Sequence, residues 1–190
     1  PDPLDPDQQS TRSIWPAVYP RLLEQIQAHR STIVFANSRR LAERICSEIN
    51  NLAGAEVAKA HHGSVAREQR LLTEEALKRG DLGAVVATSS LELGIDMGAV
   101  DLVLQVEAPT SVASGLQRVG RSGHQVGGVS KARIFPKYRG DLLVSAVVAN
   151  QMLERQVETT KIPANPLDVL SQQLVARVVA GPTSADALYE

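Results

Sequence analysis

Five short apolar runs alternate with segments of helical periodicity, and this alternation constrains the fold more than any other feature. The runs cover residues 31–36, 56–60, 82–88, 100–106 and 131–135, and they are rich in valine, isoleucine, leucine and alanine. They show little polar–apolar alternation, so both faces of each strand should be buried, as in a parallel sheet. Parallel strands joined by helices form right-handed βαβ units. We therefore predict an α/β fold, a three-layer sandwich with helices on both faces of one sheet.

Capping residues mark where several of the helices should begin. Ser38 is predicted to cap a helix that follows the first strand, and Ser64 a helix over residues 65–79. Residues 89–92 (Ser-Ser-Leu-Glu) match a capping box and predict a short helical turn. The helix after Ser38 carries one apolar stripe that should face the core, formed by Leu41, Ile45, Ile49 and Leu52.

The charge and cysteine content exclude several classes of protein. The chain has 190 residues and a formal net charge of −1, so it is not a uniformly basic nucleic-acid binder, although one face can still be basic. Its single cysteine, Cys46, excludes a disulfide framework and a zinc site built from cysteines, and it is predicted to pack rather than react. No apolar run reaches membrane-spanning length. These features predict a cytoplasmic protein with no membrane partner and no metal ligands of its own.

Composition divides the chain into three predicted parts. Residues 1–13 are rich in proline and acidic side chains without any period, which is typical of a linker. Residues 14–157 contain all the predicted strands and form the main domain. Residues 158–190 contain a helix start at Asn165 and Pro166, and they are predicted to begin a separate helical domain that is truncated. Because the chain starts with proline rather than methionine, we interpret it as a piece of a longer protein.

Polar residues follow the carboxyl ends of the first three predicted strands. They are Asn37-Ser38-Arg39, His62-Gly63-Ser64 and Thr88-Ser89-Ser90. Ligands bind at this edge of an open α/β sheet, and hydroxyls, arginines and helix-start amides are groups that contact phosphates. Each residue also has a structural alternative, since the serines can cap helices and His62 can bond a turn carbonyl. As a set, they predict an edge that binds the phosphates of a nucleotide or of a nucleic-acid backbone.

The segment QRVGRSGH, residues 117–124, brings two arginines and two glycines together. Arg118 and Arg121 are three residues apart and therefore share one helical face. Arginine clamps phosphate oxygens and cannot lose its charge, while Gly120 and Gly123 allow a ligand or another backbone to approach closely. We expect both arginines to point past the carboxyl end of the sheet, toward a triphosphate.

Four motifs together resemble those of superfamily 2 helicases. TIVFANSRRLAERI, AHHGSVAREQR, VVATSSLELGIDMGAVDLVLQ and QRVGRSGH occur in the order and at the intervals of helicase motifs IV, IVa, V and VI. The HHGS and TSSLELGID sequences, the final His124 and the tail IFPKYRGDLLVSAVVANQML are most similar to the large-helicase-related (Lhr) proteins. The resemblance implies that residues 14–157 form a second RecA-like domain, followed by the first helices of a winged-helix domain.

The resemblance also implies a role for each matching position. Arg121 would be the arginine finger that reaches the γ-phosphate of ATP, with Gln117 and Arg118 linking motif VI to the nucleotide. Gly94 and Asp96 would lie near the ribose and phosphates. His124 stands where many relatives have a second arginine, so its contact with phosphate is left open. The residues that would line the nucleic-acid track are Ser38, Arg39, His62, Gly63, Thr88 and Ser89.

The activity of the whole protein is implied in the same way. The resemblance predicts an ATP-dependent helicase or translocase that moves 3′ to 5′ on single-stranded DNA, or alternatively on RNA or a DNA–RNA hybrid, and serves DNA repair. ATP and Mg²⁺ would be held mainly by the first RecA-like domain, because this sequence has no G-x-x-x-x-G-K-[ST] loop and no D-E-x-H box. The chain alone should therefore not hydrolyse ATP. The alternative is a non-catalytic binding module; a dinucleotide enzyme is disfavoured because no G-x-G-x-x-G follows the first strand.

Overall fold

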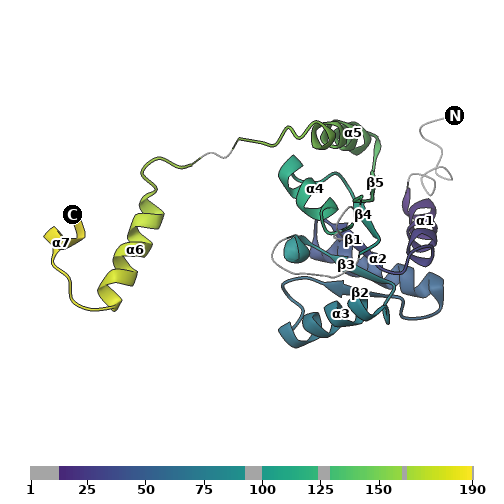
Figure 1. The fold of residues 1–190 in the computed structure, drawn as a ribbon, viewed down its shortest axis with the longest axis horizontal. Coiled ribbons are helices and arrows are strands. Elements are labelled where there is room, and N and C mark those ends of the chain that lie inside the picture. The colour runs from purple at the N-terminus through teal and green to yellow at the C-terminus, as the bar shows by residue number, and fades with distance from the viewer. Residues whose placement is uncertain (1–12, 93–99, 124–128, 160–161, 190) are drawn as a thin grey trace, which may run out of the picture. The chain divides into compact units, whose positions relative to one another are not determined.

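The computed structural model describes residues 13–92, 100–123, 129–159 and 162–189 (Figure 1). The chain forms two compact units, Pro1–Glu158 and Thr159–Glu190. The strands of the first unit are β1 (Thr32–Ala36), β2 (Ala58–His61), β3 (Ala84–Ala87), β4 (Leu102–Val106) and β5 (Ala132–Phe135). Its helices are α1 (Trp15–Gln27), α2 (Arg39–Ala53), α3 (Arg67–Arg79), the 3₁₀ turn η2 (Ser89–Leu91), α4 (Val112–Val119) and α5 (Arg139–Leu153). The second unit contains α6 (Leu167–Val179) and α7 (Ala185–Tyr189).

The strands lie parallel in one five-stranded sheet with the order β2-β3-β1-β4-β5 (Figure 1). The central strand, β1, pairs with β3 and β4, and Thr32 is level with both Ala84 and Leu102. All residues of β1, β3 and β4 are buried, which confirms the prediction of strands covered on both faces. The predicted α/β sandwich is thus confirmed, although every strand begins one or two residues later than predicted.

Successive residues of β1 divide between two hydrophobic clusters, because side chains alternate across a strand. Val34 packs on one face with α1 and α2, including Ile45, whereas Phe35 packs on the other face with Leu77 of α3. The predicted stripe of α2 is buried except at its end, where Leu52 is 51% exposed. Leu52 lies in the last turn of α2, one residue before the helix ends at Ala53.

Helix starts follow the prediction at α2 but not at the next two positions. Ser38 caps α2, because its hydroxyl accepts a hydrogen bond from the N–H of Leu41 at 3.2 Å. Ser64 is not a cap: α3 begins after Ala66 without a side-chain cap bond, and the Ser64 hydroxyl binds Arg39 instead. The predicted capping box at residues 89–92 is also wrong, since η2 has no side-chain cap bond. The side chains of Ser90 and Glu92 instead bond to His61 and Arg118, which are distant in sequence.

The start of α4 is capped by two side chains. The hydroxyl of Ser111 accepts the N–H of Ser114 at 3.0 Å. The carboxylate of Glu158 accepts the N–H groups of Val112 and Ala113 at 2.6 and 3.1 Å. These bonds lower the pKa of Glu158, chiefly through the one from Val112. A carboxylate at a helix amino terminus is also favoured by the helix dipole, so α4 begins fully hydrogen-bonded.

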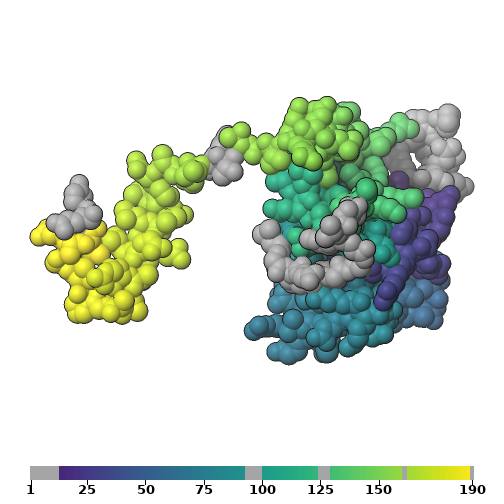
Figure 2. Space-filling view, in the orientation of Figure 1, coloured from purple at the N-terminus to yellow at the C-terminus, as the bar shows by residue number. Residues whose placement is uncertain are grey.

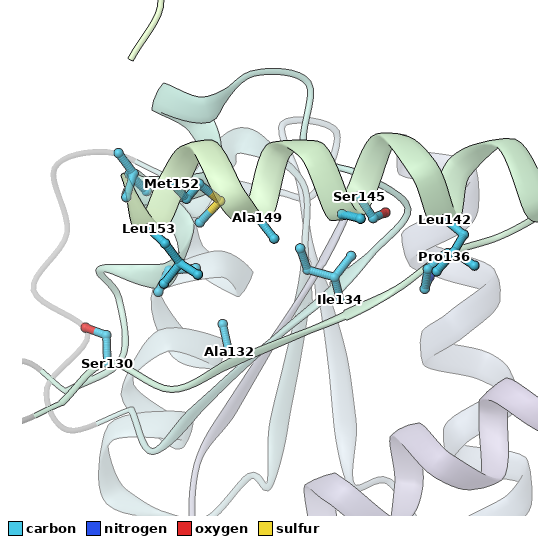
Figure 3. A pocket seen from close by; sticks show the side chains of 12 residues that line it. Ser130, Ala132, Ile134, Pro136, Leu142, Ser145, Ala149, Met152 and Leu153 are labelled. Carbon is cyan, nitrogen blue, oxygen red and sulfur yellow. The ribbon is translucent and has the colours of Figure 1, made fainter. Parts of the chain in front are cut away.

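Helix α5 packs on α4 beside the edge strand β5 and forms part of the surface of the first unit (Figure 2). Gly115 of α4 allows this approach, because a Cβ there would lie 2.6 Å from Sδ of Met152. Between the two helices and β5 lies an apolar groove of about 570 Å³, whose wall includes Ile134 and Ala149 (Figure 3). The prediction of a helix to residue 157 is four residues too long, since α5 ends at Leu153.

The second unit is small and carries little buried surface. Helix α6 begins one residue later than predicted, with Pro166 rather than Asn165 at the cap position. No residue of α6 is buried, and Leu167 and Leu170 of the predicted stripe are 72% and 52% exposed. Across the part of the chain that the structure describes, no helix combines the length and the apolar character that crossing a bilayer requires.

Candidate nucleic-acid and nucleotide sites

Five of the six predicted track residues line one pocket at the carboxyl ends of β1, β2 and β3. The pocket has a volume of about 470 Å³. Because these strands are neighbours in the sheet, three loops that are distant in sequence meet there. The wall consists of Asn37, Ser38, Arg39, Gly63, Thr88, Ser89 and Ser90. It combines one guanidinium with hydroxyl and amide groups, which suits a phosphate backbone.

The hydroxyl of Ser38 can serve the pocket and the helix at once. It accepts the N–H of Leu41 and so caps α2. A hydroxyl also carries one hydrogen to donate. The structural and the ligand-binding interpretations of this serine are therefore compatible.

The sixth predicted track residue, His62, is not part of the pocket wall. The residue is 5% exposed, and its Nε2 lies 2.6 Å from Oε1 of Glu43. Its Nδ1 accepts the N–H of Ser64 at 3.3 Å. Both ring nitrogens thus bond within the protein and tie His62 to the turn that contains Gly63.

His61, which sequence reasoning missed, connects the pocket to α3. It is 1% exposed, with Nδ1 2.8 Å from Oγ of Ser90 and Nε2 2.8 Å from Oε1 of Glu74. Burial lowers the pKa of His61 and outweighs the opposing effect of Glu74. The pair His61-His62 at the end of a strand could have indicated this arrangement, because adjacent side chains of a strand point to opposite faces.

Arg118 is buried and held by side chains of its own unit. It is 4% exposed; its Nε donates to Glu92 at 2.7 Å, and Nη1 donates to Gln105 at 2.8 Å and Asn37 at 3.0 Å. Nη2 also pairs with Glu92, and the guanidinium lies 5.2 Å from the ring centre of Phe35. The predicted link to the nucleotide stays a prediction, while the observed contacts make Arg118 the centre of a buried polar network.

Arg121 and Gln117 lie at the far end of α4. Gln117 is exposed, and the backbone carbonyl of Gln117 accepts Nε of Arg121 at 3.4 Å. The next residue, Ser122, pairs with Val100, which precedes β4, and its hydroxyl accepts the N–H of Lys131, which precedes β5.

The expectation that both arginines point past the carboxyl end of the sheet is therefore wrong for Arg121. The segment that follows α4 reaches the amino-terminal edge of the sheet, where Ser122 pairs with Val100 and the N–H of Gly123 donates to the Val100 carbonyl, ahead of β4. Arg118, the seventh of the eight residues of α4, still reaches Asn37 at the carboxyl edge through its long side chain. The predicted site residues Gly94, Asp96 and His124 lie outside the described residues.

Comparison with known proteins identifies the family. Residues 17–125 match the model of the helicase conserved C-terminal domain. The chain belongs to this family. The helicase lobe is 51% identical, over 94% of its length, to the Lhr helicase and probable uracil glycosylase of Mycolicibacterium smegmatis, and 49% identical, over 93%, to the Lhr helicase/uracil glycosylase of Escherichia coli. It spans 14% of the length of each of these two relatives.

A solved structure supports the same assignment. The structure of Mycobacterium smegmatis helicase Lhr bound to ssDNA and AMP-PNP matches with a TM-score of 0.89 and 58% identity. The match covers 94% of this helicase lobe and 24% of that chain. The prediction of a RecA-like C-terminal lobe of a superfamily 2 helicase, most similar to Lhr proteins, is confirmed.

Proposed function

We propose that this chain is the second RecA-like lobe of an ATP-dependent helicase of the Lhr type, acting in the cytoplasm on a nucleic-acid single strand. The observation that carries the proposal is the pocket at the carboxyl edge, where three helicase motifs bring one guanidinium and several hydroxyls together. Single-stranded DNA is the proposed substrate, with 3′-to-5′ movement and a role in DNA repair. Residues 158–190 would begin the winged-helix domain.

The composition of the pocket suits a motor that moves along a strand. Most of its groups are neutral donors, so each phosphate contact is weak enough to be broken and remade at every step. Arg39 adds one permanent charge, which draws the phosphate backbone to the pocket without fixing it there. The relative from Mycobacterium smegmatis, solved with ssDNA, supports a single strand as the ligand.

The nucleotide side would lie at the opposite edge of the same sheet. Arg121 follows the end of α4 near the starts of β4 and β5, away from the strand ends that form the pocket. A first RecA-like lobe of the same protein would hold ATP and Mg²⁺, and Arg121 would stabilise the charge that develops on the transferred phosphoryl group. We assign Gln117 to the same nucleotide face, and we propose from their motif positions that Gly94, Asp96 and His124, which lie outside the described residues, also serve nucleotide binding. The Mycobacterium smegmatis relative, solved with AMP-PNP, supports a nucleoside triphosphate as a ligand of the whole protein.

The finger role of Arg121 is tested by turnover in the full-length protein. Arg121→Ala should lower the kcat of DNA-stimulated ATP hydrolysis by about 10³–10⁵-fold while leaving oligonucleotide binding intact. Arg79→Ala, which removes a 62%-exposed arginine from the end of α3, is the matched control and should keep wild-type turnover. A kcat within a few-fold of wild type in Arg121→Ala would show that another group supplies the charge.

The track is tested by oligonucleotide binding over a salt series. Thr88→Val removes a hydroxyl and should weaken binding of all sequences alike, with the salt dependence unchanged. Arg39→Ala removes a cation and should also reduce the slope of log K against log salt by about 0.7 for a single strand. Losses that depend on base sequence would indicate base readout and contradict the backbone role.

A further inference from the structure

The turn of residues 62–64 is attached to the first two turns of α2 at two points. Glu43 binds the imidazole of His62 at 2.6 Å, and Nη1 of Arg39 donates to Oγ of Ser64 at 2.8 Å. Arg39 and Glu43 are four residues apart on α2, so they lie on the same face of the helix. The turn itself is closed by the bond from the N–H of Val65 to the carbonyl of His62 at 2.9 Å.

The imidazole joins these two attachments. The N–H of Ser64 donates to Nδ1 of His62, so Nδ1 carries no hydrogen. A neutral imidazole then has its hydrogen on Nε2, where it can donate to the Glu43 carboxylate. His62 therefore fixes the backbone of Ser64 from one side while Glu43 fixes His62 from the other.

Arg39 is placed by the far side of the same turn. Its guanidinium binds the hydroxyl of Ser64, and Nη2 would be 3.8 Å from a Cβ on Gly63. An arginine has five N–H donors, and the bond to Ser64 uses one of them. The turn thus holds a long, flexible side chain in the pocket wall, so that fewer of its rotamers are lost when a ligand binds.

We propose that the Glu43–His62 pair is a positioning device for Arg39: it fixes the turn of residues 62–64, and the turn presents the guanidinium to the nucleic-acid backbone. The inference rests on the proposed function of the pocket. His62 is then a positioning residue that strengthens the grip on a strand without contacting it. Its burial and its two protein partners explain why it stands in a nucleic-acid motif yet lies outside the pocket wall.

The test is the salt dependence of binding of a fluorescent oligothymidylate to the full-length protein. Arg39→Ala should reduce the slope by about 0.7. His62→Ala removes a neutral group, so a direct contact would leave the slope unchanged; the positioning role instead predicts a reduction by up to about 0.7. The double variant Arg39→Ala/His62→Ala should bind like Arg39→Ala alone, because His62 acts through Arg39.

Two further variants keep the test decisive if His62→Ala does not fold, which thermal unfolding reports. His62→Asn retains an oxygen acceptor near the position of Nδ1 and should recover much of the lost slope. Glu43→Ala removes a negative charge beside the pocket, so simple electrostatics predicts tighter binding, whereas positioning predicts weaker binding and a smaller slope. Glu75→Ala, which removes an exposed carboxylate of α3, is the charge-matched control.

The outcomes separate the two proposals. A smaller slope in Arg39→Ala with a wild-type slope in His62→Ala and Glu43→Ala would overturn the positioning role and leave the track in place. Losses that multiply in the double variant would overturn it as well. Unchanged binding in Arg39→Ala would overturn the proposed track itself.

Discussion

Replacing Arg118 by alanine should lower the free energy of unfolding of the first unit by about 3–5 kcal/mol. The figure follows from the buried network around this side chain. Arg118 is 4% exposed, and its removal leaves the carboxylate of Glu92, 14% exposed, without its charge partner. Asn37 and Gln105 each lose a donor at 3.0 and 2.8 Å. Breaking a buried pair from one side is costly because an uncompensated charge remains.

The measurement is urea denaturation of this chain, followed by far-ultraviolet circular dichroism. Arg79→Ala is the control, because Arg79 is 62% exposed and its pair with Asp81 should contribute about 0–1 kcal/mol. Replacing both members of the buried pair by leucine should recover part of the loss. If Arg118→Ala costs no more than Arg79→Ala, the network is not structural, and any loss of ATP turnover in Arg118→Ala would instead point to a contact with the nucleotide.

Three other groups give further tests. Burial raises the pKa of the Cys46 thiol to about 11. Iodoacetamide at pH 8 should therefore label this thiol far more slowly in the native chain than in urea, and equal labelling rates would contradict its burial. Burial lowers the pKa of His61 below 6.5, so as the pH falls the unfolded state takes up the proton first. The contribution of neutral His61 to the free energy of unfolding should be fully present above pH 6.5 and should decrease below that value. In urea titrations, His61→Gln should flatten this decrease. Gly123→Ala places a Cβ 2.8 Å from a backbone nitrogen at a residue with φ +72°. Gly54→Ala is the control, because Gly54 has a similar φ of +67° but open space around it, and it should cost about 1–3 kcal/mol of stability. Gly123→Ala should cost more, and equal losses in thermal melts would refute the clash.

The sheet and the pocket could be predicted from the sequence because both follow from local patterns. Runs such as residues 82–88 have too little polarity to be exposed on either face, which leaves a parallel sheet as the solution. Parallel strands bring their carboxyl ends to one edge, so the sequence predicts that Ser38, Gly63 and Thr88 converge, and they line one pocket.

The errors arise where one residue type has two possible partners. Ser64, Ser90 and Glu92 all match helix-cap patterns, yet their partners Arg39, His61 and Arg118 lie 25, 29 and 26 residues away in sequence. Local spacing does not reveal a partner that only the folded chain brings near. The direction of α4 posed a similar problem, because Arg118 and Arg121 share one helical face but lie at different depths along the sheet.

The cap of α4 has a mechanical consequence. Glu158 is the last residue of the first unit, and it accepts the first two N–H groups of the helix whose opposite end leads to Arg121. A pull on the chain that follows Glu158 acts on those two side-chain bonds as well as on the covalent backbone. A helix of eight residues has few bonds of its own to resist such a pull. A force that reaches Glu158 is therefore shared between the backbone and the first turn of α4, so a single carboxylate couples the end of the first unit to the helix that carries Arg118 and ends two residues before Arg121.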